Sequence, residues 1–131
     1  MLILYAEDDV DDYGFFEETL ARVYPVATCM NARNGREVLD ILDASAILPD
    51  LIFLDINMPT MDGKSCLKSI KTDPRLKSIP VIIYTTSSNE RDREQCLQLG
   101  AENYLIKPYG LAAAEPLIRA VLQPFIEQGK R

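Results

Sequence analysis

The sequence LIFLD at residues 51–55 decides the fold, because four apolar residues run directly into a carboxylate. A run this short and apolar on both faces predicts a buried strand that helices cover on two sides. Comparable runs, short and bounded by Pro, Asp or Gly, predict further strands at residues 2–6, 26–30, 81–85 and 103–106.

Amphipathic patterns with helical spacing fill the segments between these strands. They predict helices over residues 11–23, 35–46, 64–72, 88–99 and 111–128. The last pattern contains Pro116 and Pro124. Because proline disrupts a helix interior, we expect this helix to begin near Glu115 and to bend or end at Pro124. The alternation of strand and helix predicts a parallel α/β sheet with helices on both faces.

Composition narrows the classes of function. The 131 residues fit one domain, and 47% hydrophobic residues can form a core. A net charge of −6 disfavours DNA binding, and the basic residues between Lys64 and Lys77 are interpreted as a solvated helix face. No basic leader or membrane-length apolar run is present, which predicts a cytoplasmic protein. Without histidine the chain cannot donate phosphohistidine, and a zinc site has almost no ligands.

Polar residues follow four of the predicted strands at their carboxyl ends. Glu7 and Asp8 follow the first, Asp55 the third, Thr85 ends the fourth, and Lys107 follows the fifth. The carboxyl ends of parallel strands share one edge of the sheet, where ligands of such folds bind. Each residue alone is more commonly a helix cap, a turn residue or a surface residue. Their joint placement favours one functional site.

The residue types in this set suit phosphoryl transfer. Carboxylates brought together repel each other, and a hard divalent cation such as Mg²⁺ relieves the repulsion through oxygen ligands. Lys107 would add a fixed positive charge beside the carboxylates. Positive partners stabilise the charge on phosphoryl oxygens in the transition state, so Asp55 is the candidate nucleophile that would form an acyl phosphate.

The motifs identify a family. The strings LYAEDD at 4–9, LIFLDINMPTMDG at 51–63, PVIIYTTSS at 80–88 and LGAENYLIKP at 99–108 cover nearly the whole chain. Together they resemble the receiver domains of response regulators in two-component signalling, including the single-domain chemotaxis and phytochrome-associated types. The resemblance implies a flavodoxin-like, doubly wound sheet of five parallel strands in the order 2-1-3-4-5. It also implies a single receiver domain over residues 1–131, since only a short polar tail, residues 127–131, follows Phe125.

The resemblance also assigns roles to residues. Asp55 matches the phosphoacceptor, and it would share Mg²⁺ with Asp8, the main-chain carbonyl of Asn57 and, through water, Glu7. The other matched residues are the hydroxyl that approaches the phosphoryl group, the lysine that pairs with it and the aromatic switch: Thr85, Lys107 and Tyr104. Before phosphorylation Thr85 and Tyr104 are expected to point away from the site, and the Lys107–Pro108 bond to be cis. Gly63 is expected to serve a tight turn.

The implied partners are a histidine kinase or histidine phosphotransfer protein as donor, and a separate downstream effector protein. A monomer or weak homodimer is expected, with no membrane or direct DNA contact and no catalysis beyond the chain's own phosphorylation and dephosphorylation. Dimerisation through the face of the fourth helix, fifth strand and fifth helix, common in receivers, is in doubt because of the two prolines.

Three other functions share some features of this sequence. A haloacid dehalogenase-type hydrolase would need a second carboxylate where Asn57 stands. A pseudo-receiver would keep the fold without phosphorylation, although every expected site residue is present. A flavodoxin-like cofactor carrier would need phosphate-binding Gly, Ser or Thr after the first strand, where the sequence has acidic residues.

Overall fold

The structure, a computed structural model, describes residues 1–129. Its strands and helices alternate along the chain: β1 (Leu2–Ala6), α1 (Val10–Val23), β2 (Thr28–Ala32), α2 (Gly35–Ala44), β3 (Leu51–Leu54), α3 (Gly63–Thr72), β4 (Val81–Thr85), α4 (Glu90–Gln98), β5 (Asn103–Ile106) and α5 (Leu111–Glu127).

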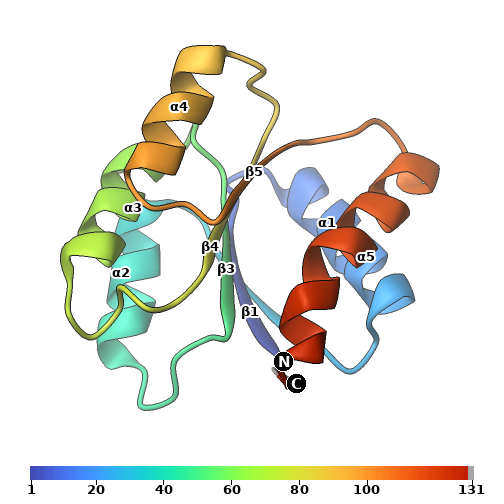
Figure 1. The fold of residues 1–131 in the computed structure, drawn as a ribbon, viewed down its shortest axis with the longest axis horizontal. Coiled ribbons are helices and arrows are strands. Elements are labelled where there is room, and N and C mark those ends of the chain that lie inside the picture. Colours follow the sequence, from blue (N-terminus) through green and yellow to red (C-terminus); the bar gives the residue numbers. More distant parts are fainter. Residues whose placement is uncertain (130–131) are drawn as a thin grey trace.

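The strands form one parallel sheet in the order β2-β1-β3-β4-β5. Helices α1 and α5 cover one face of the sheet, and α2, α3 and α4 cover the other (Figure 1). The order reverses between β1 and β3, where the chain crosses from one half of the sheet to the other. The predicted flavodoxin-like, doubly wound fold is therefore confirmed.

Two hydrophobic cores fill the space between the sheet and its helices. Under α2, α3 and α4, buried aliphatic residues such as Leu54, Leu67 and Ile83 pack together. Under α1 and α5, the core is aromatic, with Tyr5, Phe16, Phe53 and Tyr84 in mutual ring contact. The ring centroids of Tyr5 and Phe16 lie 4.5 Å apart, and those of Phe16 and Phe53 lie 4.9 Å apart. The two cores fix the strand ends that carry the polar residues.

Four strands coincide with the predicted runs, but β2 lies two residues later than residues 26–30. Val26 is 67% exposed in the turn before the strand, despite its strong strand propensity. Pairing with β1 sets the register instead, because Thr28 N–H donates to Met1 O at 2.8 Å. The predicted bounds of this edge strand, residues 26–30, are therefore wrong.

Capping side chains move several helix starts. Asp9 and Asp62 cap α1 and α3, which each begin one residue earlier than predicted. Asn89 caps α4, which begins at Glu90 rather than at Ser88. At its other end α2 stops at Ala44, two residues before the predicted end.

The expectation for the last helix was wrong. Helix α5 begins at Leu111, four residues before Glu115, and continues past Pro124 to Glu127. The turn before Pro116 is rich in alanine, which has the highest helix propensity, and Ala114 is fully buried. The burial of Ala114 and the high helix propensity of alanine in this turn outweigh the cost of the hydrogen bond that Pro116 cannot donate.

The expected cis bond at Lys107–Pro108 is also wrong, since the peptide bonds of the described residues are trans. The trans isomer is the intrinsically more stable form of an X–Pro bond, by about 0.5–1 kcal/mol. The polar tail extends to residues 130 and 131, which lie outside the described residues.

Two cations of the basic segment bind backbone rather than forming only a solvated face. Arg75 donates to the carbonyl oxygens of Leu42 and Ser45 at 2.9 and 2.6 Å, which satisfies the carboxyl end of α2. Lys71 donates to Ile79 O at 2.7 Å, and burial lowers the pKa of its ammonium. The interpretation as a solvated face therefore holds for Lys68 and Lys77, which are exposed, and is wrong for Lys71, which is partly buried, while the exposed Arg75 also caps α2.

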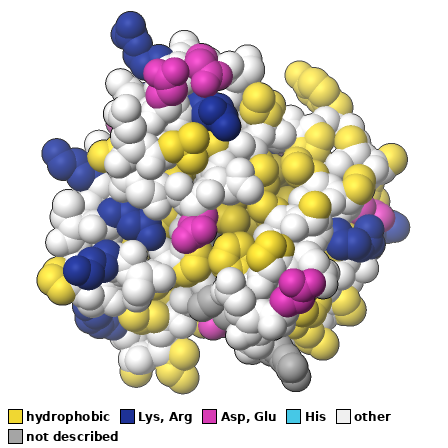
Figure 2. Space-filling view, viewed as in Figure 1, with side chains coloured by type: hydrophobic (Ala, Val, Ile, Leu, Met, Phe, Trp, Pro, Cys, Tyr) yellow, Lys and Arg dark blue, Asp and Glu magenta, His cyan; other side chains and the backbone are white. Residues whose placement is uncertain are grey.

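Residues 1–129 contain no helix with the length and apolar character needed to cross a membrane. In the space-filling view, hydrophobic side chains gather along the middle of the face where β5 and α5 lie (Figure 2). Lys and Arg side chains lie mainly on the side of α2, α3 and α4 in this view.

Candidate functional site

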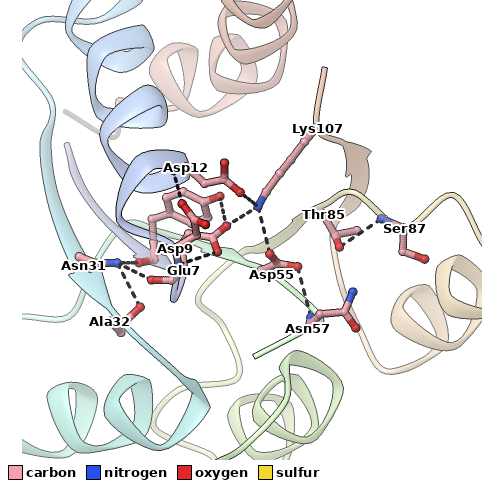
Figure 3. A network of polar contacts seen from close by, with 11 residues as sticks. Glu7, Asp9, Asp12, Asn31, Ala32, Asp55, Asn57, Thr85, Ser87 and Lys107 are labelled. Atoms are coloured by element: carbon pink, nitrogen blue, oxygen red, sulfur yellow. Dashed lines mark hydrogen bonds and ion pairs between the residues drawn. The ribbon is translucent and has the colours of Figure 1, made fainter. Parts of the chain in front are cut away.

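The structure brings the predicted residues together at the carboxyl edge of the sheet. Glu7 follows β1, Asp55 follows β3, Thr85 ends β4 and Lys107 follows β5 (Figure 3). The four strands are consecutive in the sheet, in the order β1-β3-β4-β5, so their carboxyl ends lie along one stretch of its edge. The structure thus brings Glu7, Asp55 and Lys107, which are distant in sequence, into contact.

Lys107 lies at the centre of the charges. Its Nζ donates to Glu7 Oε1, to Asp55 Oδ2 at 3.0 Å and to Asp12 Oδ2 at 3.3 Å. The side chains of Lys107, Glu7 and Asp55 are 11%, 2% and 9% exposed. One buried ammonium thus joins two nearly buried carboxylates from different strands.

Tyr5 completes this side of the site, and sequence reasoning did not single it out. Its hydroxyl donates to Glu7 Oε1 at 3.0 Å, while Asp9 N–H donates to Glu7 Oε2 at 3.2 Å. Both oxygens of the buried Glu7 carboxylate therefore have protein donors. Tyr5, Glu7 and Lys107 are called the closed flank below.

Asn31 holds the backbone of this flank. Its amide Nδ2 lies 3.1 Å from the carbonyl oxygens of Tyr5 and Glu7, to which it donates from the neighbouring edge strand. These two hydrogen bonds fix the backbone at the carboxyl end of β1, next to the site. The misplaced second strand explains why sequence reasoning missed Asn31.

Electrostatics favour a charged Lys107. Burial alone would lower the pKa of Lys107, but the hydrogen bond to Glu7 and the charge of Asp55 outweigh it and raise that pKa. Burial raises the pKa of the Glu7 carboxyl, and the bond from Lys107 opposes this shift. Burial, together with the adjacent Glu7 charge, also raises the pKa of the Tyr5 hydroxyl, which keeps it a donor.

Asp55 is 7% exposed, and each of its oxygens has a donor. Oδ1 accepts from Asn57 N–H at 3.2 Å and Oδ2 accepts from Lys107. Gly63 packs directly beneath it, because an added Cβ would lie 2.1 Å from Asp55 O. The close approach of the backbone of α3, rather than a special turn conformation, is what requires glycine at position 63.

The surface is hollowed beside Ile56 and Asn57, the two residues that follow Asp55. Asp8 is exposed and lines an open hollow of about 510 Å³ together with Asn57, Asp62 and Lys64. Asp8, Asn57 and Asp62 are called the open flank below. The contrast with the closed flank is plain, because here the carboxylates have room beside them.

The donors on the open side fit a magnesium ion. Mg²⁺ is commonly held by one or two carboxylates with several waters rather than by a cage of protein ligands. Asp8, Asp55 and the Asn57 carbonyl supply oxygen donors of this kind. Within residues 1–129 no three Cys, Asp or Glu side chains are grouped closely enough to hold a metal ion by themselves.

A strained turn shapes the loop between β3 and α3. Thr60 has a φ of 68°, a left-handed conformation that is unfavourable for a β-branched residue. Met61 N–H donates to Pro59 O across this turn, and Met61 O accepts from Gly35 N–H at the start of α2. The loop that carries Asn57 is therefore tied to a second helix, a contact that the sequence did not indicate.

The residues assigned to switching form a connected set. Thr85 is fully buried, and its Oγ1 lies 3.4 Å from Ser87 N–H. Tyr104 is 9% exposed, and its hydroxyl donates to Ser87 O at 2.9 Å. The ring of Tyr104 thus lies inward and is bonded to the loop that follows β4.

An unpredicted ion pair extends this set to α3. Ser87 Oγ donates to Asp92 Oδ2 at 2.7 Å, and Lys64 Nζ donates to Asp92 Oδ1 at 2.5 Å. Lys64 had been interpreted as part of a solvated face. Its contacts depend on how α3 and α4 pack, which residue spacing within one helix does not show.

Comparisons with known proteins agree with this geometry. The family model of the response regulator receiver domain matches residues 3–123. The chain is 36% identical over 121 residues to a probable cyclic di-GMP phosphodiesterase of Vibrio cholerae, covering 92% of this chain and 26% of that protein. It is 31% identical to the chemotaxis protein CheY1 of Helicobacter pylori, covering 93% of this chain and 97% of that protein. The chain thus spans only a quarter of the Vibrio relative.

Solved structures are similar over nearly the whole chain. The phosphorylated cyanobacterial phytochrome response regulator RcpA has a TM-score of 0.86 at 33% identity, covering 93% of this chain and 91% of that one. The Mn²⁺-bound form of the response regulator Rcp1 has a TM-score of 0.83 at 31% identity, covering 92% and 91%.

Proposed function

This chain belongs to the response regulator receiver domain family, and we propose that Asp55 is its phosphoacceptor in two-component signalling. The observation that carries the proposal is the buried ammonium of Lys107, 3.0 Å from Asp55 Oδ2, opposite an open hollow lined by Asp8 and Asn57. A carboxylate between a fixed cation and a space with oxygen donors is equipped to receive a phosphoryl group.

The proposed reaction is a displacement at phosphorus. An oxygen of the Asp55 carboxylate forms a bond to the phosphorus atom of the donor. The donor's P–N bond breaks if it is a phosphohistidine, or its P–O bond if it is an acyl phosphate. The electron pair of that bond leaves with the imidazole or the carboxylate, and the imidazole takes its proton from water. Lys107 balances the charge on the phosphoryl oxygens throughout.

Magnesium fits the oxygen donors of the open flank. When bound, it supplies positive charge beside the phosphoryl oxygens. Asp8 and Asp55 would hold it through their carboxylates and Asn57 through its backbone carbonyl, whereas the carboxylate of Glu7, expected to act through water, is directed at Lys107 and Tyr5. The Mn²⁺-bound form of Rcp1 supports a divalent ion in this family of sites.

The phosphoryl group would change the contacts of Thr85 and Tyr104. Moving a two-state equilibrium from mostly one state to mostly the other takes about 5.5 kcal/mol of differential binding. Charge-assisted hydrogen bonds contribute about 1.5–3 kcal/mol each, so new bonds to Thr85 and Lys107 and the metal contacts can supply this. Tyr104 would carry the change outward through its bond to Ser87 O.

We infer that the donor is a histidine kinase or histidine phosphotransfer protein and that the output is binding of an effector protein. The same site would catalyse only the chain's own phosphorylation and dephosphorylation. The exposed acidic opening at residues 8–12 disfavours an anionic target such as DNA at this edge.

Incubation with acetyl phosphate and Mg²⁺, followed by intact-mass measurement, tests the assignment. We expect a mass gain of one phosphoryl group in the native chain and none in Asp55→Asn. Asp40→Asn, an exposed carboxylate on α2, is the matched control and should be phosphorylated like the native chain. No gain in the native chain would indicate a pseudo-receiver, and a gain that survives Asp55→Asn would place the acceptor elsewhere.

A further inference from the structure

We propose that Tyr5 is a positioning residue for phosphorylation, which holds Lys107 against Asp55 through Glu7. This inference rests on the proposed function. Tyr5 is fully buried within β1, so its side chain cannot contact an incoming donor. Any effect of Tyr5 on the reaction must pass through the residues that it touches.

The contact is specific. The Tyr5 hydroxyl and Lys107 Nζ both donate to Oε1 of Glu7, while Oε2 is held by Asp9 N–H. Glu7 is 2% exposed, so water cannot replace a lost donor without reaching a buried oxygen. Removing the Tyr5 hydroxyl therefore leaves Lys107 as the only side-chain donor to Oε1 in the described part of the chain.

The aromatic core makes Tyr5 a rigid support. Its ring contacts those of Tyr13, Phe16, Phe53 and Tyr84, with centroids 4.5 to 6.4 Å apart. Asn31 fixes the backbone on either side of the strand end, at the carbonyls of Tyr5 and Glu7. The ring contacts and the backbone hydrogen bonds of Tyr5 together hold its hydroxyl in place. The hydroxyl in turn orients the carboxylate of Glu7.

The effect should fall on Lys107 rather than on the metal ion. Glu7 directs Oε1 at Lys107, whereas the oxygen donors for Mg²⁺ lie on the open flank, where Asp8 is exposed. Supporting partners of this kind typically change activity by about 10- to 100-fold when removed. Since the Phe ring preserves the packing, we expect the lower end of this range.

The test is Tyr5→Phe, which removes one oxygen atom. At saturating Mg²⁺ the rate constant for phosphorylation by acetyl phosphate should fall about tenfold, while the Kd for Mg²⁺ from calorimetry changes less than about twofold. Tyr13→Phe is the matched control, because it removes a hydroxyl from the ring stacked on Tyr5 without touching the bond to Glu7, and it should change neither value.

A double variant tests whether Tyr5 acts through Lys107. In a Lys107→Met background, Tyr5→Phe should slow phosphorylation by no more than about twofold further, because residues that act through one path are not additive. Full tenfold loss in that background overturns the route through Lys107. A weakened Kd for Mg²⁺ with an unchanged rate, or no change in either, overturns the proposal. If the native chain itself is not phosphorylated, the proposed function fails instead.

Discussion

The two flanks of Asp55 differ in how their charged side chains are compensated. On the closed flank every charge has a protein partner, because Lys107 and Tyr5 both donate to the buried carboxylate of Glu7. On the open flank Asp8 is exposed beside a hollow of about 510 Å³. One side of the nucleophile is thus preorganised by the fold, and the other is left for components that arrive from solution.

This difference predicts that mutations on the two flanks have different effects. A buried ion pair becomes costly when one partner is removed, since the other charge stays buried without compensation. An exposed carboxylate among other carboxylates instead repels its neighbours until a cation binds. Loss of a charge on the closed flank should therefore lower stability in addition to slowing phosphorylation, whereas mutation of the open flank should act mainly on ion binding.

Removal of the Lys107 charge should have the largest effect on stability. Lys107→Met keeps most of the apolar stem but leaves Glu7 and Asp55 as buried carboxylates without their shared cation. We expect the free energy of unfolding at pH 7 to fall by about 3 kcal/mol in urea titrations. Lys68→Met, an exposed lysine on α3, should change it by less than about 0.5 kcal/mol. Equal stability of the two variants would contradict the buried ion-pair description.

The substitution Gly63→Ala should have the next largest effect on stability. Gly63 packs against the backbone of Asp55, which lies between the two flanks. The added Cβ of Gly63→Ala would overlap Asp55 O and the backbone of Ile56, so the loop must shift. We expect a loss of about 2 kcal/mol in the free energy of unfolding. Gly14→Ala on α1, where an added Cβ meets nothing within 4 Å, should stabilise the chain by about 0.5–1 kcal/mol. Losses of the same size in both variants would show that close packing is not the cause.

Neutralising Asp8 should have the smallest effect on folding, and of the opposite sign. Without Mg²⁺, Asp8→Asn should raise the free energy of unfolding by about 0.5 kcal/mol, because one of the repelling carboxylates is lost. The Kd for Mg²⁺ should rise at least tenfold, or about 1.4 kcal/mol. Asp43→Asn on the exposed face of α2 should change neither quantity. Unchanged Mg²⁺ binding in Asp8→Asn would remove Asp8 from the metal site.

The sequence predicted the parts of the fold that depend on uninterrupted apolar runs. Residues 51–54 and 81–85 are buried on both faces, so no other register suits them, and both strands were located correctly. Edge strand β2 has exposed and polar positions, and only its pairing with β1 sets its limits. Helix α5 was misjudged at its start because the cost of Pro116 was weighed without the burial of Ala114.

The site shows the same division. Glu7, Asp55 and Lys107 could be predicted because polar residues at strand ends stand out against apolar strands. Tyr5 could not, because a tyrosine inside a strand is usually a core residue, and its hydroxyl gains a role only from the tertiary position of Glu7. Gly63 was noticed for the wrong reason, since the distance to Asp55 O depends on how α3 packs.

The inward orientation of the Lys107 ammonium affects how other molecules approach this edge. Lys107 directs its donor at internal carboxylates, whereas Asp8, Asp9, Asp11 and Asp12 face the solvent. Within the screening distance of about 8 Å at physiological ionic strength, the acids dominate the local potential. A protein with a basic contact surface would therefore be steered toward Asp55, and its association rate would decline as salt is added.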